Sequence, residues 1–397
     1  MTPRRRSPSL NERELRLWKV RRALVLAFVA AVLVAGGVFY GLVVLLDFQE
    51  IDTTTKLDAK TLFDLVKLSF GVVAGAGALV ALVVAYRRQR VDEAGAHREA
   101  TRLHTERFSQ AVDKLGSDSP AVRLGGVHAL AGLADDAPTR ELRQTCIDVL
   151  CAYIRLPYTT QADLPAGDAD ARRTYLSFRE VRHTVLRLVR DHLRLPREHH
   201  SWVGHDFDFT DAVFDGGDFS GATFSGGRVS FSGATFSGGR VSFSNATFSG
   251  SKVDFYDAKF SGGEVDFHGA TFSGGKVSFH GATFSGSTVP FSVATFSGGE
   301  VSFFKVMFSG STVSFFDATF SGGEVSFFMA TFSGGEVSFS HATFCGSEAT
   351  FSMATFSGST VGFDSARGPA PRGLLDAVGT PAPAEVVLPS AWLPPVP

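Results

Sequence analysis

Two long apolar runs near the N-terminus predict membrane-spanning helices. Ala23 to Leu46 is a run of 24 uncharged, mostly apolar residues, and Leu68 to Tyr86 is a second run of 19. At 1.5 Å per residue each run can cross a hydrocarbon core ~30 Å thick. Buried helices of soluble proteins rarely stay uncharged this long, and a cleaved signal peptide has a shorter apolar region. We therefore expect a two-helix transmembrane hairpin with helices at 23–46 and 68–86.

The charges that flank these runs predict the orientation of the hairpin. Residues 1–22 carry eight Arg and Lys residues, and Arg87, Arg88 and Arg90 follow the second run. The loop between the runs, residues 47–67, has more acidic than basic residues. Because basic residues favour the cytoplasmic side, both termini are expected in the cytoplasm of a plasma-membrane protein, with the loop outside.

A helical segment is predicted after the second run, over residues 87–158. Mixed charges up to Lys114 indicate that the second membrane helix continues into solvent, and Ser119-Pro120 is a typical helix start. A further helix is expected from Thr139 to about Ile154. Cys146 and Cys151 lie in it without a neighbouring His, so we expect helix-core residues and no metal or redox site.

A linker at 159–171 leads to a basic amphipathic helix, placed within residues 172–204. Its expected apolar side consists of Leu176, Val181, Val185, Leu188, Val189 and Leu193. Two roles are open for this helix. It could cover the first coil of the repeat that follows, or its Arg residues could contact anionic lipid headgroups. We favour the covering role, since a solenoid must have its first coil covered.

Phenylalanine recurs with a fixed period over the C-terminal half. The spacing is five residues from Phe209 to Phe224, and it then alternates between seven and five up to Phe363. The repeating unit is therefore twelve residues, Ala-Thr-Phe-Ser-Gly-Gly-x-Val-Ser-Phe-Ser-Gly, with Ala or Val two residues before each Phe. This period is not helical, and the Ser and Gly residues indicate corners between short extended segments. We expect a β-solenoid over 205–365.

The Ala-x-Phe element resembles the pentapeptide-repeat family, whose motif places a small residue two positions before a central Leu or Phe. Ala212-Val213-Phe214 and Ala222-Thr223-Phe224 match that motif without gaps. The resemblance implies a right-handed quadrilateral β-helix in which the small residue and the central Leu or Phe both point inward. The N-terminal part, including Val122-Arg123-Leu124-Gly125-Gly126, is similar to membrane-anchored members from high-GC Gram-positive (actinobacterial) bacteria. The expected fold is thus an α + β-solenoid.

Two-residue inserts such as Gly227-Arg228 depart from the family pattern and change the expected coil. One insert follows every second pentapeptide. A coil of four pentapeptides would therefore contain two inserts, and Lys252 would lie one full coil after Arg228. Residues 24 apart should then lie above one another, a prediction favoured over a flat coil of 12. One stacked series would be Arg228, Lys252, Lys276, Glu300, Glu324 and Glu348, and the opposite one Arg240, Glu264, Thr288, Thr312, Glu336 and Thr360.

Large apolar side chains at outward positions form the candidate partner surface. They are Phe304, Phe316, Phe328, Met329 and Met353. We expect an apolar patch on one face toward the C-terminal end, used for self-association or for a protein partner. Drift of the repeat without any function is an equally good explanation of these residues.

No motif in the chain predicts an enzyme. We find no nucleophile elbow, phosphate loop or dinucleotide fingerprint in a strand-to-helix context, and the Gly-Gly pairs are corners. His199, His200, His205, Asp206 and Asp208 lack metal-ligand spacing. We therefore expect no catalytic, cofactor or metal site. Three Cys at wide spacing suit a reducing compartment.

Composition leaves two classes of function. Some soluble pentapeptide-repeat proteins inhibit DNA gyrase by mimicking DNA, and residues 205–363 hold 14 acidic against 6 basic residues. The chain as a whole has a net charge of −2, and a membrane anchor suits a chromosomal target poorly. We favour a membrane-anchored scaffold or protein-interaction module, with gyrase-directed mimicry as the alternative, and expect no nucleic-acid partner.

The Pro-rich segment 366–397 has two possible structures. Leu374, Leu375, Val386, Val387, Leu388 and Trp392 could fold back to cover the last coil, which would otherwise expose a strand edge. Otherwise the segment is a disordered tail.

Overall fold

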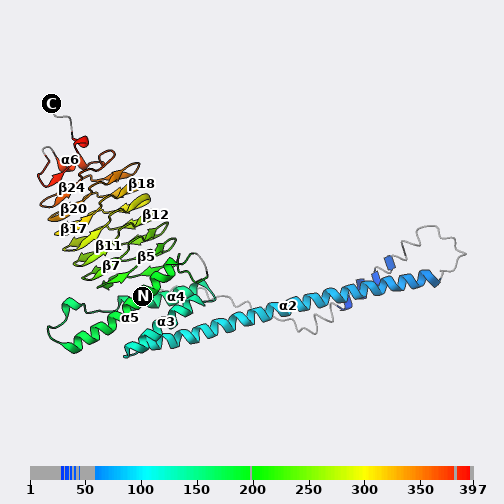
Figure 1. The fold of residues 1–397 in the computed structure, drawn as a ribbon. Coiled ribbons are helices and arrows are strands. Elements are labelled where there is room, and N and C mark those ends of the chain that lie inside the picture. Colours follow the sequence, from blue (N-terminus) through cyan, green and yellow to red (C-terminus); the bar gives the residue numbers. More distant parts are fainter. Residues whose placement is uncertain are drawn as a thin grey trace, which may run out of the picture. The chain divides into compact units, whose positions relative to one another are not determined.

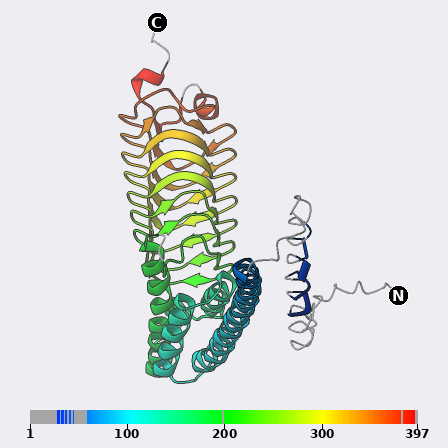
Figure 2. The same ribbon diagram turned by 90° about the vertical axis from the view of Figure 1, so that its right-hand side faces the viewer.

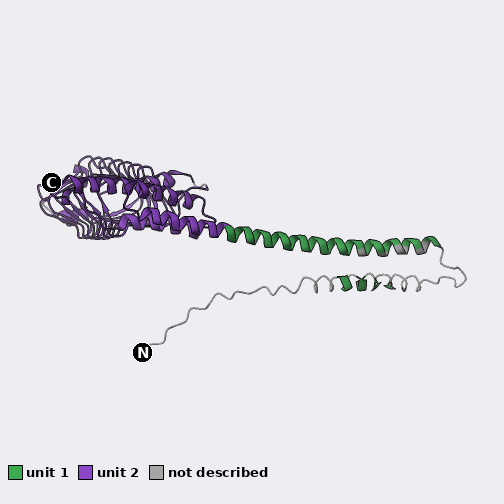
Figure 3. Ribbon diagram, turned by 90° about the horizontal axis from the view of Figure 1, so that it is seen from below, with its two compact units in different colours: residues 1–99 green, residues 100–397 purple. Residues whose placement is uncertain are grey.

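A computed structural model describes residues 28–30, 32–34, 36–37, 40–41, 44, 59–196, 199–379 and 382–393. The chain divides into two compact units, residues 1–99 and 100–397 (Figure 3). The predicted membrane helix at 23–46 lies largely outside the described residues. Those residues of it that are described are helical.

Helix α2 (Ala59–Leu115) contains the second predicted membrane span. It begins inside the segment 47–67 that the sequence predicted as a loop, and it continues past Tyr86 as expected. Of the described helices, one stretch, Phe70–Leu115, is long and apolar enough to cross a membrane, judged by length and composition alone. Its apolar side chains are uncovered by described residues: Phe70 is 71% and Leu82 66% exposed. The two-helix hairpin stays a prediction.

The second unit begins with a helical domain, built from the end of α2, α3 (Pro120–Asp135), α4 (Arg140–Arg155) and α5 (Ala169–Arg194), with a 3₁₀ turn η1 (Gln161–Asp163) in the linker. Thr139 caps α4 by accepting a hydrogen bond from the Leu142 amide, and Asp168 caps α5. Gly126 allows close packing, since a Cβ there would lie 2.7 Å from the backbone nitrogen of Leu115. Cys146 and Cys151 are buried helix-core residues, as predicted.

The remaining chain is a β-solenoid of about seven coils in three parallel sheets (Figure 1). The first sheet has β1 (Phe207–Asp208), β4 (Thr223–Phe224), β5 (Arg228–Ser230), β8 (Thr247–Phe248), β9 (Lys252–Asp254), β12 (Thr271–Ser278), β15 (Thr295–Ser302), β18 (Thr319–Ser326), β21 (Thr343–Phe344) and β22 (Glu348–Thr350). The second has β2 (Val213–Phe214), β6 (Thr235–Phe236), β10 (Lys259–Ser261), β13 (Thr283–Ser285), β16 (Met307–Ser309), β19 (Thr331–Phe332) and β23 (Thr355–Phe356). The third has β3 (Gly217–Asp218), β7 (Arg240–Ser242), β11 (Glu264–Asp266), β14 (Thr288–Pro290), β17 (Ser311–Ser314), β20 (Gly335–Ser338), β24 (Thr360–Gly362) and β25 (Val386–Val387).

Strand pairing confirms the expected register, in which residues 24 apart are neighbours. Lys252 pairs with Lys276, Lys276 with Glu300, and Glu300 with Glu324. The first coil is shorter, because Phe214 pairs with Phe236, whereas a full coil would lead to Gly238. Figure 2 shows the broad strands β12, β15 and β18 stacked in successive coils. The right-handed quadrilateral form stays a prediction.

Stacked phenylalanine rings fill the interior. Phe260 and Phe284 have ring centroids 4.3 Å apart and nearly parallel planes, and Phe255 and Phe279 lie 4.7 Å apart. The Ala or Val two residues before each Phe is also buried, as predicted. Such ring pairs add ~0.5–1.5 kcal/mol beyond the burial of their area. The core is therefore an aromatic stack that repeats from coil to coil.

One corner position in each half-coil adopts the left-handed conformation. It lies two residues after the core Phe and is occupied by Gly281, with φ +70°, or by non-glycine residues such as Asp257 and Val293, with φ +52° and +60°. At a second corner type, a Cβ on Gly275 would lie 2.2 Å from the carbonyl oxygen of Ser251. The Ser-Gly-Gly pattern thus follows from close stacking of coils.

The segment after the repeat covers the last coil, so of the two structures considered above the described part adopts the first. β25 pairs with β24, and Leu374 of helix α6 (Leu374–Val378) is buried. Trp392, in the 3₁₀ turn η2 (Ser390–Trp392), donates a hydrogen bond to the Gly368 carbonyl at 2.8 Å. The final strand edge is therefore paired within the chain.

Candidate functional site

A groove of about 730 Å³ lies on the outer surface of the first sheet, toward the C-terminal end of the solenoid. Its lining combines carboxylates, hydroxyls and aromatic rings, and the segment after the repeat forms one wall. The lining residues of the sheet include Glu300, Ser302, Phe304, Glu324, Ser326, Phe328, Glu348, Thr350 and Ser352, and the wall includes Pro369, Ala370, Pro371 and Arg372. Because alternate strand residues point outward, two coils each contribute a carboxylate, a hydroxyl and an aromatic ring, and the third contributes a carboxylate and two hydroxyls.

These lining residues belong to columns, by which we mean residues 24 apart that lie above one another in successive coils. The charged column is Arg228, Lys252, Lys276, Glu300, Glu324 and Glu348, and its pairing is continuous in the structure. The aromatic column lies four residues further along each strand and corner: Ser232, Tyr256, His280, Phe304, Phe328 and Ser352.

The structure separates the five residues of the predicted partner patch. Phe304 and Phe328 are half-buried neighbours whose rings stack 5.8 Å apart. Met329 and Met353 follow the aromatic column at the left-handed corner, and Met353 is 66% exposed. Phe316 follows β17 of the third sheet, where it contacts His341. The expectation of a single face is therefore wrong for Phe316, because it lies half a coil from both Phe304 and Phe328. The partner role of all five stays a prediction.

The aromatic column is longer than the sequence patch suggested. The ring of His280 lies 5.2 Å from that of Tyr256 and 4.7 Å from that of Phe304, edge to face in both cases. Tyr256 is 44% exposed. Four rings thus form a continuous outer row, which sequence reasoning missed because it considered Phe and Met alone.

Most charges in the charged column form no ion pair with the residues that the structure describes. Lys276 donates to Glu300, one coil further along, at 2.6 Å. No ion pair with another described residue is formed by Arg228, Lys252, Glu324 or Glu348. On the third sheet, by contrast, Arg240 contacts both Glu264 and Asp266. The first sheet therefore presents free charge of both signs beside its aromatic row.

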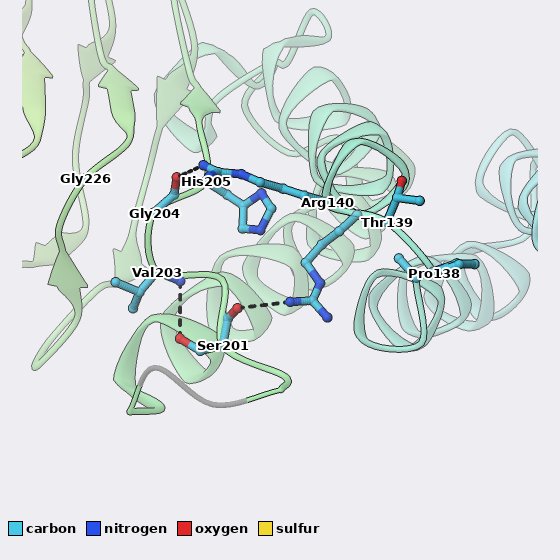
Figure 4. A pocket seen from close by; sticks show the side chains of 10 residues that line it. Pro138, Thr139, Arg140, Ser201, Val203, Gly204, His205 and Gly226 are labelled. Atoms are coloured by element: carbon cyan, nitrogen blue, oxygen red, sulfur yellow. Dashed lines mark hydrogen bonds between the residues drawn. The ribbon is translucent and has the colours of Figure 1, made fainter. Parts of the chain in front are cut away.

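A second, polar pocket of about 540 Å³ lies between the start of α4 and the loop that enters the solenoid (Figure 4). Arg143 donates to the carbonyls of Ala134, Asp135, His199 and Ser201, and Arg140 to that of Gly204. Burial and the two nearby guanidinium groups lower the pKa of His205 to about 4. Both arginines are thus engaged in joining the loop to the helices.

A buried polar cluster joins α5 to the first coil. Asp215 accepts hydrogen bonds from Tyr175 and Tyr158 at 2.7 and 2.8 Å, and His183 lies 3.6 Å away. Burial opposes its charge, but these contacts lower the pKa of Asp215 to about 2. Asp215 is buried although it lies on the outside of the coil, because α5 covers it.

Arg182 completes this joint between helix and solenoid. Its side chain is buried, and it donates to the carbonyls of Ile154 and Val213 at 2.6 Å each. A Cβ on Gly217 would lie 2.8 Å from Cδ1 of Leu186, in the same helix as Arg182, so the glycine allows this close approach. Helix α5 therefore has the covering role favoured from the sequence, and its predicted apolar side is correct for Val181, Val185, Val189 and Leu193 but wrong for Leu176, which is half exposed.

Metal-ligating geometry is not found among the residues that the structure describes: no three His, Cys, Asp or Glu side chains are grouped to hold an ion. His205 donates through Nδ1 to Gln144, whose carbonyl oxygen Oε1 can accept but not donate. Cys146 contacts His104 in the helical core, and burial raises the pKa of its thiol to about 11. The groove on the first sheet is accordingly the best candidate for function, as a binding surface.

Comparison with known proteins agrees with the repeat pattern. Residues 238–279 match the family described as pentapeptide repeats (9 copies). Neither the curated proteins nor the solved structures contain a match to the chain. The matched stretch lies inside the β-solenoid and shares its Ala-x-Phe elements. Over residues 238–279 the solenoid is therefore similar to the pentapeptide-repeat family.

Proposed function

We propose that this protein is a non-enzymatic scaffold, anchored in the plasma membrane by a two-helix hairpin, whose right-handed quadrilateral solenoid binds protein on the cytoplasmic side. The observation that carries the proposal is the groove on the first sheet, where an outer aromatic row runs beside unpaired charges. Large apolar side chains on a surface are typical of interaction sites. Both ends of the solenoid are covered within the chain, so partners would use its sides.

Membrane anchoring is supported by the composition of α2. Its stretch from Phe70 to Tyr86 presents apolar side chains that described residues do not cover, and Arg87, Arg88 and Arg90 follow directly. Basic residues at the end of an apolar helix favour the cytoplasmic side. The eight basic residues of segment 1–22 give the same orientation to the first predicted span.

The alternative, gyrase-directed DNA mimicry, has less support. A DNA mimic needs a continuous acidic surface. Here the basic residues Arg228, Lys252 and Lys276 occupy half of the charged column, and Arg240 neutralises Glu264 and Asp266. Retention of gyrase by the detergent-solubilised full chain would favour mimicry, whereas retention of membrane proteins would favour the scaffold.

Cys345 gives a direct test of the anchoring and its orientation. It is exposed, whereas Cys146 and Cys151 are buried, and burial raises the pKa of the Cys151 thiol to about 12. Thiolates are the reactive species, so Cys345 should be the one thiol that a maleimide labels quickly. We expect a membrane-impermeant maleimide to label the full chain after permeabilisation of cells but not before.

The control replaces Cys345 with Ser and places Cys at position 56 in the predicted outer loop. This variant should be labelled in intact cells. The chain should also remain in the membrane pellet after extraction with alkaline carbonate. Labelling of Cys345 in intact cells would contradict the cytoplasmic placement, and release by carbonate would contradict the anchor.

A further inference from the structure

The charged column of the first sheet is complementary to its own reverse. From the N-terminal to the C-terminal coil it reads Arg228, Lys252, Lys276, Glu300, Glu324, Glu348. Reversing this order exchanges every basic residue for an acidic one. The centre of the pattern lies between Lys276 and Glu300.

The aromatic column has the same centre and the same symmetry. Its sequence is Ser232, Tyr256, His280, Phe304, Phe328, Ser352, so two rings lie on each side of the midpoint and a serine closes each end. The column between the two carries small polar side chains: Ser230, Asp254, Ser278, Ser302, Ser326 and Thr350. Three adjacent columns therefore share one centre.

Within a single chain this arrangement is unfavourable. Arg228 lies directly against Lys252, and Glu324 against Glu348, in paired strands. Like charges on neighbouring strands destabilise a sheet. Among the described residues, the ion pair within the column is that of Lys276 with Glu300 at the midpoint. A surface that costs stability in the monomer can be favourable in an assembly.

We propose that the partner of this surface is a second copy of the chain, packed antiparallel and face to face on the first sheet. The two-fold axis lies in the plane of the interface, along the strand direction, between the coils of Lys276 and Glu300. Each column of one copy then faces the same column of the other copy, which runs in the opposite direction. Arg228 faces Glu348 of the other copy, Lys252 faces Glu324, Tyr256 faces Phe328, and His280 faces Phe304.

The charged column has a basic half and an acidic half, and this favours a second copy of the chain as the partner. A basic peptide would engage Glu324 and Glu348 but would leave Arg228 and Lys252 without partners, and an acidic peptide would do the reverse. A second copy pairs all four. At the adjoining corner Met353 of one copy would face Gly233 of the other, which leaves room for the Met353 side chain. Asp257 would face Met329, a pair that adds no favourable contact.

The size of the face indicates a weak dimer. Five coil steps of ~4.8 Å and a width of about four residues give a patch ~24 Å by ~13 Å. Interfaces of this size are transient in solution. Confinement to a membrane would raise the effective concentration of the copies. This inference rests on the proposed role as an interaction module, and it identifies the partner as a second copy of the chain.

Charge reversal tests the proposal on the full chain in detergent. Glu324→Lys with Glu348→Lys makes the face basic, and Arg228→Glu with Lys252→Glu makes it largely acidic. By sedimentation velocity each variant alone should dimerise roughly 10- to 100-fold more weakly than the wild type. An equimolar mixture of the two should restore dimerisation, because every reversed residue then faces its opposite. Restoration also shows that both variants are folded.

The matched control makes a similar charge change on the third sheet, Glu336→Lys with Thr360→Lys, and should dimerise like the wild type. Orientation is tested by a short bismaleimide in a Cys345→Ser background. Ser230→Cys mixed with Thr350→Cys should cross-link, while Ser230→Cys alone should not, because its two copies would lie ~24 Å apart.

Three results would overturn the dimer. They are a monomer at all concentrations, a dimer indifferent to the charge variants, and cross-linking of Ser230→Cys to itself in preference to Thr350→Cys. None of these bears on carbonate extraction or on the labelling of Cys345. Failure of the dimer is thereby distinguished from failure of the membrane-anchored scaffold.

Discussion

At the scale of single residues, the corner after each core Phe tolerates side chains that its backbone disfavours. Glycine occupies some of these corners, but Val293 adopts φ +60° with its side chain about half exposed. A β-branched residue in the left-handed region is strained by ~1–2 kcal/mol. Val293 gains little burial in return, so its corner stores strain that the stacked coils hold in place.

We expect Val293→Gly to stabilise the protein by ~1 kcal/mol, because glycine adopts this conformation without steric cost. The gain is measured as a higher midpoint of thermal unfolding by circular dichroism. Val293→Ala, which keeps a Cβ but loses the branch, should gain less. A lower midpoint for the glycine variant would show that the Val293 side chain contributes more by packing than it costs in strain.

Residue patterns predicted the inward positions well, since alternation and the twelve-residue period act on every coil alike. The core Phe residues from Phe209 to Phe351 and Phe363 are buried as the period requires, and Phe356 in the last coil is partly buried. The period could not predict Asp215 or Arg182. Their burial depends on where α5 covers the first coil, and a contact between distant segments leaves no periodic signal in either one.

At the scale of elements, the joint between α5 and the first coil depends on a buried carboxylate. Asp215 is 7% exposed, and Arg179 lies 3.7 Å from it in addition to the two tyrosines and His183. Removing one member of a buried polar network leaves the others without partners, at a cost of ~2–4 kcal/mol. The start of the solenoid therefore depends on this one side chain.

Asp215→Asn should lower stability at neutral pH and change its pH dependence. The pKa of Asp215 is depressed to about 2, so its contribution is complete above the unfolded value near 4 and is lost as pH falls toward 2. That contribution is about 2 kcal/mol. Thermal midpoints of wild type and variant should therefore converge between pH 4 and pH 2.

The control is Asp317→Asn, at an exposed corner of the third sheet, which should unfold like the wild type at every pH. A constant difference between wild type and Asp215→Asn from pH 7 to pH 2 would contradict the role of the charge. It would leave packing of the side chain as the cause.

Element boundaries followed from the sequence where a local signal marks them, as Ser119-Pro120 and Thr139 do for α3 and α4. The exposure of individual side chains did not always follow from the sequence. Leu176 was placed on the apolar side of the basic helix, but it lies near the start of α5 and is half exposed. The candidate groove was partly predictable: its columns follow from the register of the coils, but its wall, Pro369 to Arg372, does not.

At the scale of the whole molecule, two repeats per coil make the two halves of each coil similar in core but different in surface. Each half contributes two Phe and two small residues to the interior. The columns outside differ, since aromatic rings follow the first sheet and mostly serines the third. Because coils contact mainly their neighbours, stability is approximately a sum over coils.

Deletion of one whole coil, 255–278, and deletion of one half-coil, 255–266, should both leave a folded solenoid. The longer deletion keeps the remaining columns in register. The shorter one moves Phe304 and Phe328 to the face of Arg240, away from Arg228 and Lys252. Circular dichroism should show retained β-structure for both, and sedimentation should show loss of the dimer for the shorter deletion. An unfolded half-coil deletion would show that the half-coils are not interchangeable.

Coils that contact mainly their neighbours also bear on how the molecule responds to force. Each coil adds ~4.8 Å to the length of the folded solenoid, but its chain spans ~80 Å when drawn out. In a chain anchored and bound as proposed, tension between the membrane and a partner at the far end would therefore release chain one coil at a time, starting at the weaker end. The solenoid would then act as a tether that extends in steps, and its length would increase by about 75 Å for each coil that unfolds.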